Sequence, residues 1–193
     1  MHMAKPNVKE KLIEAGLKAL LAGGFNGVGV QEITDAAGVP KGSFYNHFDS
    51  KETLGAEIVE RYGMNTARRS FLLDKNLRPL ERLREHFTAL NDMFINLKFA
   101  RGCLLGNFSA ELANQSDLIR NSLAKIFERW TEDLEIAIAD AQQEGTVSSD
   151  YEAADLAAFL LDAYEGTLLR ARVERNRAPF DRFMKLAFEK ILT

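Results

Sequence analysis

Residues 41–47 concentrate side chains that carry positive charge or exchange hydrogen bonds. They are Lys41, Ser43, Tyr45, Asn46 and His47. Such groups suit phosphate oxygens and the base edges of a DNA major groove. Phe44 and Phe48 stand among them four residues apart, a spacing that puts both rings on one face of a helix. The segment is therefore expected to form a short helix with one apolar face and one DNA-contacting face.

A second amphipathic segment precedes this polar helix. Val30, Ile33 and Ala37 recur at helical spacing and fall on one face. Gly38 can adopt the left-handed backbone that ends a helix, and Pro40 lacks the N–H that would continue it. Two short helices joined in this way predict a helix-turn-helix unit, whose second helix enters a major groove.

Composition favours an all-helical protein, because the 193 residues include only four prolines and nearly half are apolar. The net charge of −3 is unusual for a DNA-binding protein, whose footprint is expected to be basic. However, residues 1–20 carry four lysines against two glutamates, and residues 38–51 carry two lysines against one aspartate. The positive charge is therefore concentrated around the motif.

The chain also indicates its compartment. The single cysteine, Cys103, excludes an internal disulfide and favours a reducing cytoplasm. No apolar run approaches the roughly 18 residues needed for a membrane span. The residues before the first expected helix hold no apolar stretch, so we expect no secretory signal. A cytoplasmic protein without a membrane partner is predicted.

Apolar residues recur at helical spacing along the rest of the chain and predict about nine helices and no strand. Asn7, with Glu10 three residues later, is expected to cap the first helix. Asp49 and Glu52 have the same spacing and are expected to open a long fourth helix that runs toward Leu73.

Many residues at fixed spacing match one family pattern: Leu12, Ile13, Ala15, Gly24, Phe25, Ile33, 36–39, Lys41, Gly42, Tyr45, His47, Phe48, Lys51, Glu52 and Leu54. In these positions the first 55 residues resemble the DNA-binding domain of the tetracycline-repressor-like (TetR) family of one-component transcriptional regulators. The sequence departs from that pattern at Val28 and Gly29, where the family usually has Thr or Ser. Gly29 remains an acceptable helix N-cap, so the departure affects one phosphate contact and not the fold.

The resemblance implies an all-α fold with a helix-turn-helix domain at residues 1–50 and a helical domain at residues 51–193, the helix from about residue 50 being shared. The second domain would bind an effector and dimerise through its last two helices. The implied function is a homodimeric repressor that binds a pseudo-palindromic operator in double-stranded DNA and is released by an unknown small molecule. The expected interface residues are Ala163, Gly166, Thr167, Phe180, Phe183, Met184 and Phe188.

The expected DNA contacts have different roles. Resemblance and chemistry assign phosphate contacts to Tyr45 and Lys51, whereas Lys41, Ser43 and Asn46 are better placed for base edges. His47 has two interpretations: it donates to a phosphate, or it packs between helices as a neutral ring. The full candidate set is Gln31, Lys41, Gly42, Ser43, Tyr45, Asn46, His47 and Lys51.

Two interpretations of the effector site stay open. The stretch 101–111 resembles a subgroup that responds to small reactive or unsaturated compounds, so Cys103 is either a thiol sensor of electrophiles or an inert packed thiol. Aromatic rings with isolated polar groups on inner helix faces also predict a cavity. The candidate lining is Phe87, Asn91, Phe94, Cys103, Asn107, Phe127, Trp130, Phe159 and Tyr164.

The sequence has none of the catalytic motifs HExxH, GxSxG or GxxxxGK[ST]. The three histidines, at positions 2, 47 and 86, share no metal-ligand spacing. We therefore expect no enzyme activity, no cofactor and no metal. The competing hypothesis is a helical enzyme or small-molecule carrier with a vestigial helix-turn-helix. Neither the effector nor the operator follows from the residues.

Overall fold

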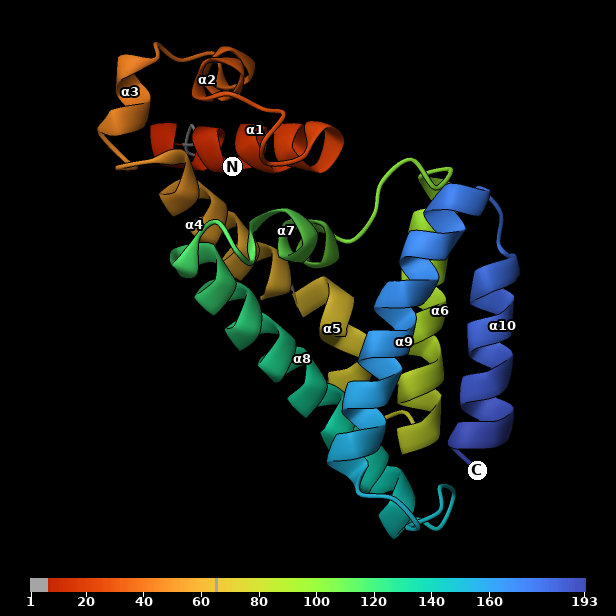
Figure 1. The fold of residues 1–193 in the computed structure, drawn as a ribbon. Coiled ribbons are helices and arrows are strands. Elements are labelled where there is room, and N and C mark those ends of the chain that lie inside the picture. Colours follow the sequence, from red (N-terminus) through yellow and green to blue (C-terminus); the bar gives the residue numbers. More distant parts are fainter. Residues whose placement is uncertain (1–6, 65) are drawn as a thin grey trace, which may run out of the picture. The chain divides into compact units, whose positions relative to one another are not determined.

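The computed structural model describes residues 7–64 and 66–193, and the regular secondary structure of this part of the chain is entirely helical, with no strand (Figure 1). The expected all-α fold is confirmed. The helices are α1 Val8–Gly23, α2 Val30–Ala37, α3 Gly42–Tyr45, α4 Lys51–Gly63, α5 Thr66–Leu73, α6 Pro79–Asn96, α7 Leu104–Leu112, α8 Asp117–Gln143, α9 Ala153–Glu174 and α10 Ala178–Leu186, followed by a π-helical turn at Ala187–Ile191.

The chain divides into two compact units, each built from two stretches of sequence. Unit 1 comprises Met1–Met64 and Leu104–Ile126, and unit 2 comprises Asn65–Cys103 and Phe127–Thr193. Unit 1 therefore extends beyond the boundary expected near residue 50 and takes in α7 and the first part of α8. The rest of α8 belongs to unit 2.

Side-chain caps start two helices of unit 1. The Asn7 side chain accepts a hydrogen bond from the Glu10 N–H at 2.9 Å, as predicted. Helix α4 is capped by Ser50, whose Oγ accepts from the Thr53 N–H at 3.2 Å. The cap expected at Asp49 is therefore one residue later. Both caps satisfy N–H groups that the helix itself leaves without partners.

The core of unit 1 is formed by apolar side chains from each of its first four helices. Leu12 of α1, Ile33 of α2, Phe44 of α3 and Leu54 of α4 are fully buried. Helix α1 contacts α2, α3 and α4, and α7 lies beside α4 (Figure 1). The rows of apolar residues read from the sequence therefore do face a shared interior.

The long helix expected from residue 50 toward Leu73 is wrong, because α4 ends at Gly63 and α5 begins at Thr66. Gly63 packs so closely against Ile126 that a Cβ on it would overlap the isoleucine side chain. This approach requires glycine, which also weakens a continuing helix. The interruption explains why the described residues contain ten α-helices where nine were expected.

Unit 2 is a separate bundle in which α5 packs on α6, and α10 packs on α6 and α9 (Figure 1). Aromatic rings fill its centre. The ring of Phe87 lies 5.0 Å from that of Tyr164 and 4.9 Å from that of Phe183. The guanidinium of Arg82, whose residue is 2% exposed, pairs with Asp140 of α8 and so keeps a buried charge compensated.

Candidate nucleic-acid interface and effector core

The turn between α2 and α3 has the geometry predicted from its sequence. Gly38 adopts a left-handed conformation, with φ 67° and ψ 38°. Its N–H donates to the Asp35 carbonyl, and the Val39 N–H donates to the Thr34 carbonyl at 3.0 Å. These bonds satisfy carbonyls at the end of α2. Helix α3 then starts in a new direction two residues after Pro40.

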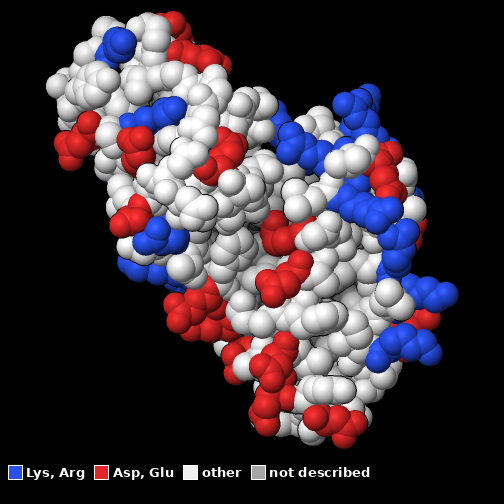
Figure 2. All heavy atoms as spheres, viewed as in Figure 1, with Lys and Arg blue, Asp and Glu red and all other residues white. Residues whose placement is uncertain are grey.

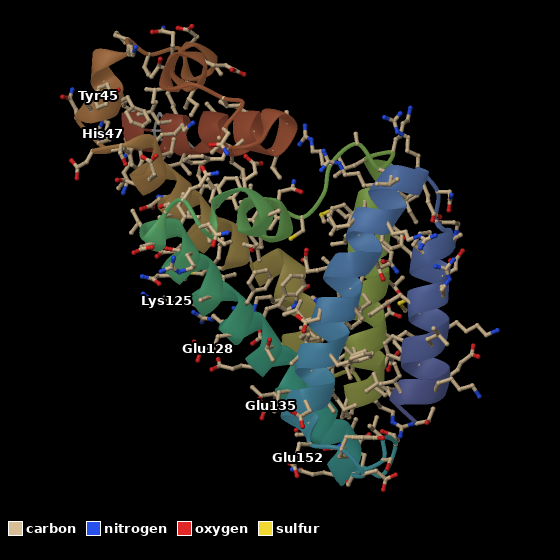
Figure 3. All side chains as sticks on the ribbon, in the orientation of Figure 1. Tyr45, His47, Lys125, Glu128, Glu135 and Glu152 are labelled. Atoms are coloured by element: carbon tan, nitrogen blue, oxygen red, sulfur yellow. The ribbon has the colours of Figure 1, made fainter. Side chains whose placement is uncertain are left out.

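Helix α3 is anchored by one face and exposed on the other. Phe44 is 0% exposed and Phe48 is 3% exposed, and their rings pack 5.6 Å apart. The opposite side is open to solvent; Tyr45 projects from the outer edge of α3, and His47 projects from the turn that follows it (Figure 3). The exposed residues of the candidate set here are Lys41, Gly42, Tyr45, Asn46 and His47, with Ser43 half-buried. This side could meet a groove without disturbing the core.

Lys51 has a structural role that the sequence did not indicate. Its Nζ donates to the carbonyls of Phe25 and Val28, both at 2.9 Å, and lies 4.3 Å from the centre of the Phe25 ring. An ammonium group has three protons, so one proton is left for a phosphate. Gln31, by contrast, is exposed on α2 and donates to Asp35 at 2.7 Å.

Other cations of unit 1 are engaged by neighbouring acids. Lys9 pairs with Glu57 at 3.4 Å, and Arg61 pairs with both Glu57 and Glu10. The hydrogen bond from Arg61 lowers the pKa of the Glu10 carboxyl. Figure 2 shows basic and acidic side chains interspersed over α1–α4 rather than one uniformly basic face. The charge on this face of unit 1 is therefore mixed, without the uniformly basic surface that supports strong non-specific binding to DNA.

A buried polar pair lies among the aromatic rings of unit 2. The Tyr164 hydroxyl donates to Asn91 Oδ1 at 3.0 Å, and both residues are buried. A second polar pair joins α8 to α6: the indole N–H of Trp130 on α8 donates to Nε2 of His86 on α6 at 3.1 Å. Such groups orient a small ligand when a cavity opens beside them. Phe87, Asn91 and Tyr164 thus come together in one packed core, and their assignment to an effector cavity stays a prediction.

Cys103 is 5% exposed and its thiol donates a hydrogen bond to the Glu165 carboxyl. Burial raises the pKa of that carboxyl, and the hydrogen bond partly offsets the shift. The other oxygen, Oε1, is buried without a hydrogen-bond partner. Sequence reasoning missed the contact between Cys103 and Glu165 because the two residues lie far apart in the chain.

A narrow crevice lies beside this core and has no room for a water molecule. Apolar side chains form most of its wall, and two arginines add positive charge. It is lined by Phe94, Phe99, Arg101, Leu168, Ala171, Arg172 and Phe180. Of the expected lining residues, Phe94 borders this crevice.

Other expected lining residues are placed elsewhere. Phe159 is 53% exposed on α9, so its assignment to an internal cavity is wrong. Asn107 lies on α7, within unit 1. Phe127 and Trp130 are half-buried on α8. Helical periodicity could not separate these cases, because it identifies an apolar face without its neighbour.

The expected dimer residues also divide into two groups. Phe180, Phe183 and Phe188 are buried inside the protomer, so they are corrected to core residues. Gly166 is exposed on α9 with open space beside it, and Ala163, Thr167 and Met184 are half-buried. The large apolar side chains that these helices leave exposed are Phe159, Leu169, Val173 and Leu186.

No helix among residues 7–64 and 66–193 is both long and apolar enough to cross a membrane. The same residues hold no group of three or more His, Cys, Asp or Glu side chains placed to bind a metal ion.

Comparison with known proteins gives matches over both parts of the chain. A model of bacterial regulatory proteins of the tetR family matches residues 12–58, and a model of the tetracyclin repressor-like C-terminal domain matches residues 79–187. The HTH-type transcriptional repressor DhaR of Mycobacterium sp. (strain GP1) is 40% identical over 192 residues, which cover 98% of this chain and 95% of DhaR.

Solved structures agree with these matches. The regulatory protein TetR from Rhodobacter sphaeroides is 35% identical, with a TM-score of 0.87 over 94% of this chain and 97% of that one. The reduced form of E. coli NemR is 27% identical, with a TM-score of 0.84 over 96% of this chain and 97% of that one. With two family models and a relative of 40% identity along nearly its whole length, the chain belongs to the TetR family of transcriptional regulators.

Proposed function

We propose that this regulator represses transcription as a homodimer on a pseudo-palindromic operator and that a small molecule releases it. The observation that carries the DNA-binding step is the exposed polar side of α3, held in place by buried Phe44 and Phe48. Two such helices, one from each protomer, would enter successive major grooves about 34–36 Å apart. DhaR, which matches nearly the whole chain, is named a repressor.

Titration with DNA from upstream of the protein's own gene tests this function. Contacts to phosphates release counterions, so the logarithm of the association constant should fall linearly with the logarithm of salt concentration, by about 0.9 for each phosphate. A random duplex of equal length serves as the control and should bind more weakly. An affinity that does not change with salt concentration, or equal affinity for both duplexes, would favour the competing hypothesis of a helical enzyme or small-molecule carrier.

The dimer would be formed by the exposed apolar stripe of α9. Phe159, Gly166 and Val173 recur seven residues apart and so lie on one face, with half-buried Ala163 between them. Small residues at Ala163 and Gly166 permit close approach of a second helix, and the larger side chains supply apolar area. A two-fold arrangement would bring this face against its own copy.

The effector would bind in unit 2, where buried hydrogen bonds are available to be exchanged. A ligand that takes over the Tyr164–Asn91 hydrogen bond would require the surrounding rings to move. It would lower operator affinity only by its preference for the released conformation. Replacement of Asn91 by Leu should abolish the response to such a ligand while operator binding persists, which parallel titrations would detect.

A covalent mode of release is the alternative, and it would use the contact between Cys103 and Glu165. Glu165 could accept the Cys103 proton, so that the thiolate adds to an electrophile and the carboxyl returns the proton to the adduct. The relative NemR has a structure described as the reduced form. Treatment with N-ethylmaleimide should then release operator from the wild type and not from Cys103→Ser. Release of both proteins alike would leave only the non-covalent mode.

A further inference from the structure

The turn between α1 and α2, residues 24–28, is held from two directions within unit 1. From α7, the Glu111 carboxylate accepts a hydrogen bond from the Asn26 backbone N–H at 3.0 Å. From α4, Lys51 Nζ donates to the carbonyls of Phe25 and Val28. Gly29, the N-cap of α2, follows directly. The position of this turn therefore sets where α2 begins.

The fit between α7 and the turn is close. Gly24 has φ 75°, and a Cβ on it would lie 2.7 Å from a carboxylate oxygen of Glu111. The ring of Phe25, which is 3% exposed, packs edge-on against Phe108 of α7 with centroids 5.6 Å apart. A hydrogen bond and an aromatic contact thus join α7 to the same short turn, which leaves the turn little freedom to shift.

The charge of Glu111 acts against DNA binding. A carboxylate in a unit that binds a polyanion lowers affinity by electrostatics alone. Its geometric effect has the opposite sign, because it holds the turn before α2, and α2 packs against α3. The two effects can be separated experimentally, since removal of the side chain changes affinity in opposite directions in the two cases.

We propose that Glu111 is a positioning residue for operator binding. It fixes turn 24–28 and, through α2, the direction in which α3 presents its polar side. Helix α7 begins at Leu104, directly after Cys103, so a displacement of that segment would reach α2 through Glu111. This inference rests on the proposed operator binding, and it adds a residue that lies outside the helix-turn-helix itself.

The test compares Glu111→Ala and Glu111→Gln with Glu60→Ala, which removes an exposed glutamate of α4. Operator affinity is measured by fluorescence anisotropy at several salt concentrations. Glu111→Ala should bind about three- to tenfold more weakly, the loss expected when one solvent-exposed hydrogen bond of ordinary net strength is removed. Glu111→Gln keeps an oxygen acceptor and should recover part of the affinity. Glu60→Ala should bind as tightly as wild type or more tightly.

Two further readouts separate positioning from general damage. The salt slope should stay unchanged in Glu111→Ala, because no phosphate partner is lost. Hydrogen exchange should accelerate in a peptide covering turn 24–28 of both Glu111 variants, while exchange in α9 stays at the wild-type rate. Affinity equal to or above wild type in a folded Glu111→Ala would overturn the inference. Absence of operator binding by the wild type would instead refute the proposed function.

Discussion

Lys41 and Lys51 show how two lysines in one motif differ in their expected contributions. Lys41 is exposed before α3, whereas Lys51 binds two carbonyls of the α1–α2 turn. Lys51→Ala should therefore lower stability by about 1–2 kcal/mol and weaken binding to all sequences. If its remaining proton contacts a phosphate, the salt slope should also decrease by about one.

Lys41→Ala should leave thermal stability unchanged and relax the preference at particular base pairs by about 1–3 kcal/mol. Calorimetry and titration against operator variants would measure both quantities. If Lys41→Ala and Lys51→Ala change thermal stability and base-pair preference in the same way, the assignment of separate roles is incorrect.

Asp140 should contribute to stability in a pH-dependent way. Hydrogen bonds from Arg82 and then Lys75 lower the pKa of its carboxyl in the folded protein. The stabilisation is therefore complete above the ordinary aspartate pKa of about 3.9 and is lost as pH falls through the lower folded value. Asp140→Asn should lower stability by about 1–3 kcal/mol at pH 7, because Arg82 is buried.

The same variant should flatten the acid limb of a plot of unfolding free energy against pH. Urea unfolding between pH 3 and 7 would measure it, with Asp150→Asn, an exposed residue, as the control. An acid limb as steep as that of the wild type would show that other carboxyls control acid unfolding.

At the scale of residues, local pattern predicted which side chains of residues 41–48 are exposed and which are buried, but it did not predict the contacts that hold this segment's neighbours in place. The polar side of α3 follows from spacing alone, because Phe44 and Phe48 define the buried side. The bond between Glu111 and Asn26 joins residues 85 positions apart. No periodicity reports a contact of that kind, which depends on how separate helices pack.

At the scale of helices, apolar spacing predicted most boundaries but not the interruption at Gly63. A single glycine inside a helical pattern costs only about 1 kcal/mol, so by itself it does not predict an end. The close contact of Gly63 with Ile126 on α8 joins residues far apart in the sequence, so no local pattern could report it. The phenylalanines of α10 are a similar case. Their spacing predicted correctly that they are buried, but they pack inside the protomer and not against a second subunit as expected.

Gly63→Ala should destabilise the protein by about 1–3 kcal/mol, because the added methyl overlaps Ile126 in a packed interior. Gly42→Ala is a matched control, since a Cβ there would meet nothing within 4 Å. Differential scanning calorimetry compares the two variants. Equal transition temperatures would mean that the α4–α8 contact is looser than described.

At the scale of the whole molecule, the exposed stripe of α9 predicts the assembly. Val173→Asp should split the dimer, because the side chain is 84% exposed in the protomer and its loss leaves the core intact. Light scattering should then give a mass near 21.6 kDa, about half that of the wild type, with unchanged helical content by circular dichroism.

Phe183→Asp should behave differently from Val173→Asp, because its ring is 7% exposed and packs against Phe87. It should unfold unit 2 rather than yield a folded monomer. A wild-type mass near that of one chain at micromolar concentration would refute the dimer, and with it the spacing of two half-sites.

The discontinuous make-up of unit 1 affects how this regulator could be re-engineered. Chimaeric repressors are made by grafting the DNA-reading part of one protein onto the sensor of another at a single junction. Here a junction near residue 50 or 64 would omit Leu104–Ile126. In that stretch Phe108 packs against the ring of Phe25, and Ile119 lies close to Gly55. A functional graft would need both stretches of unit 1. It would therefore carry α7 and the first part of α8 along with the helix-turn-helix.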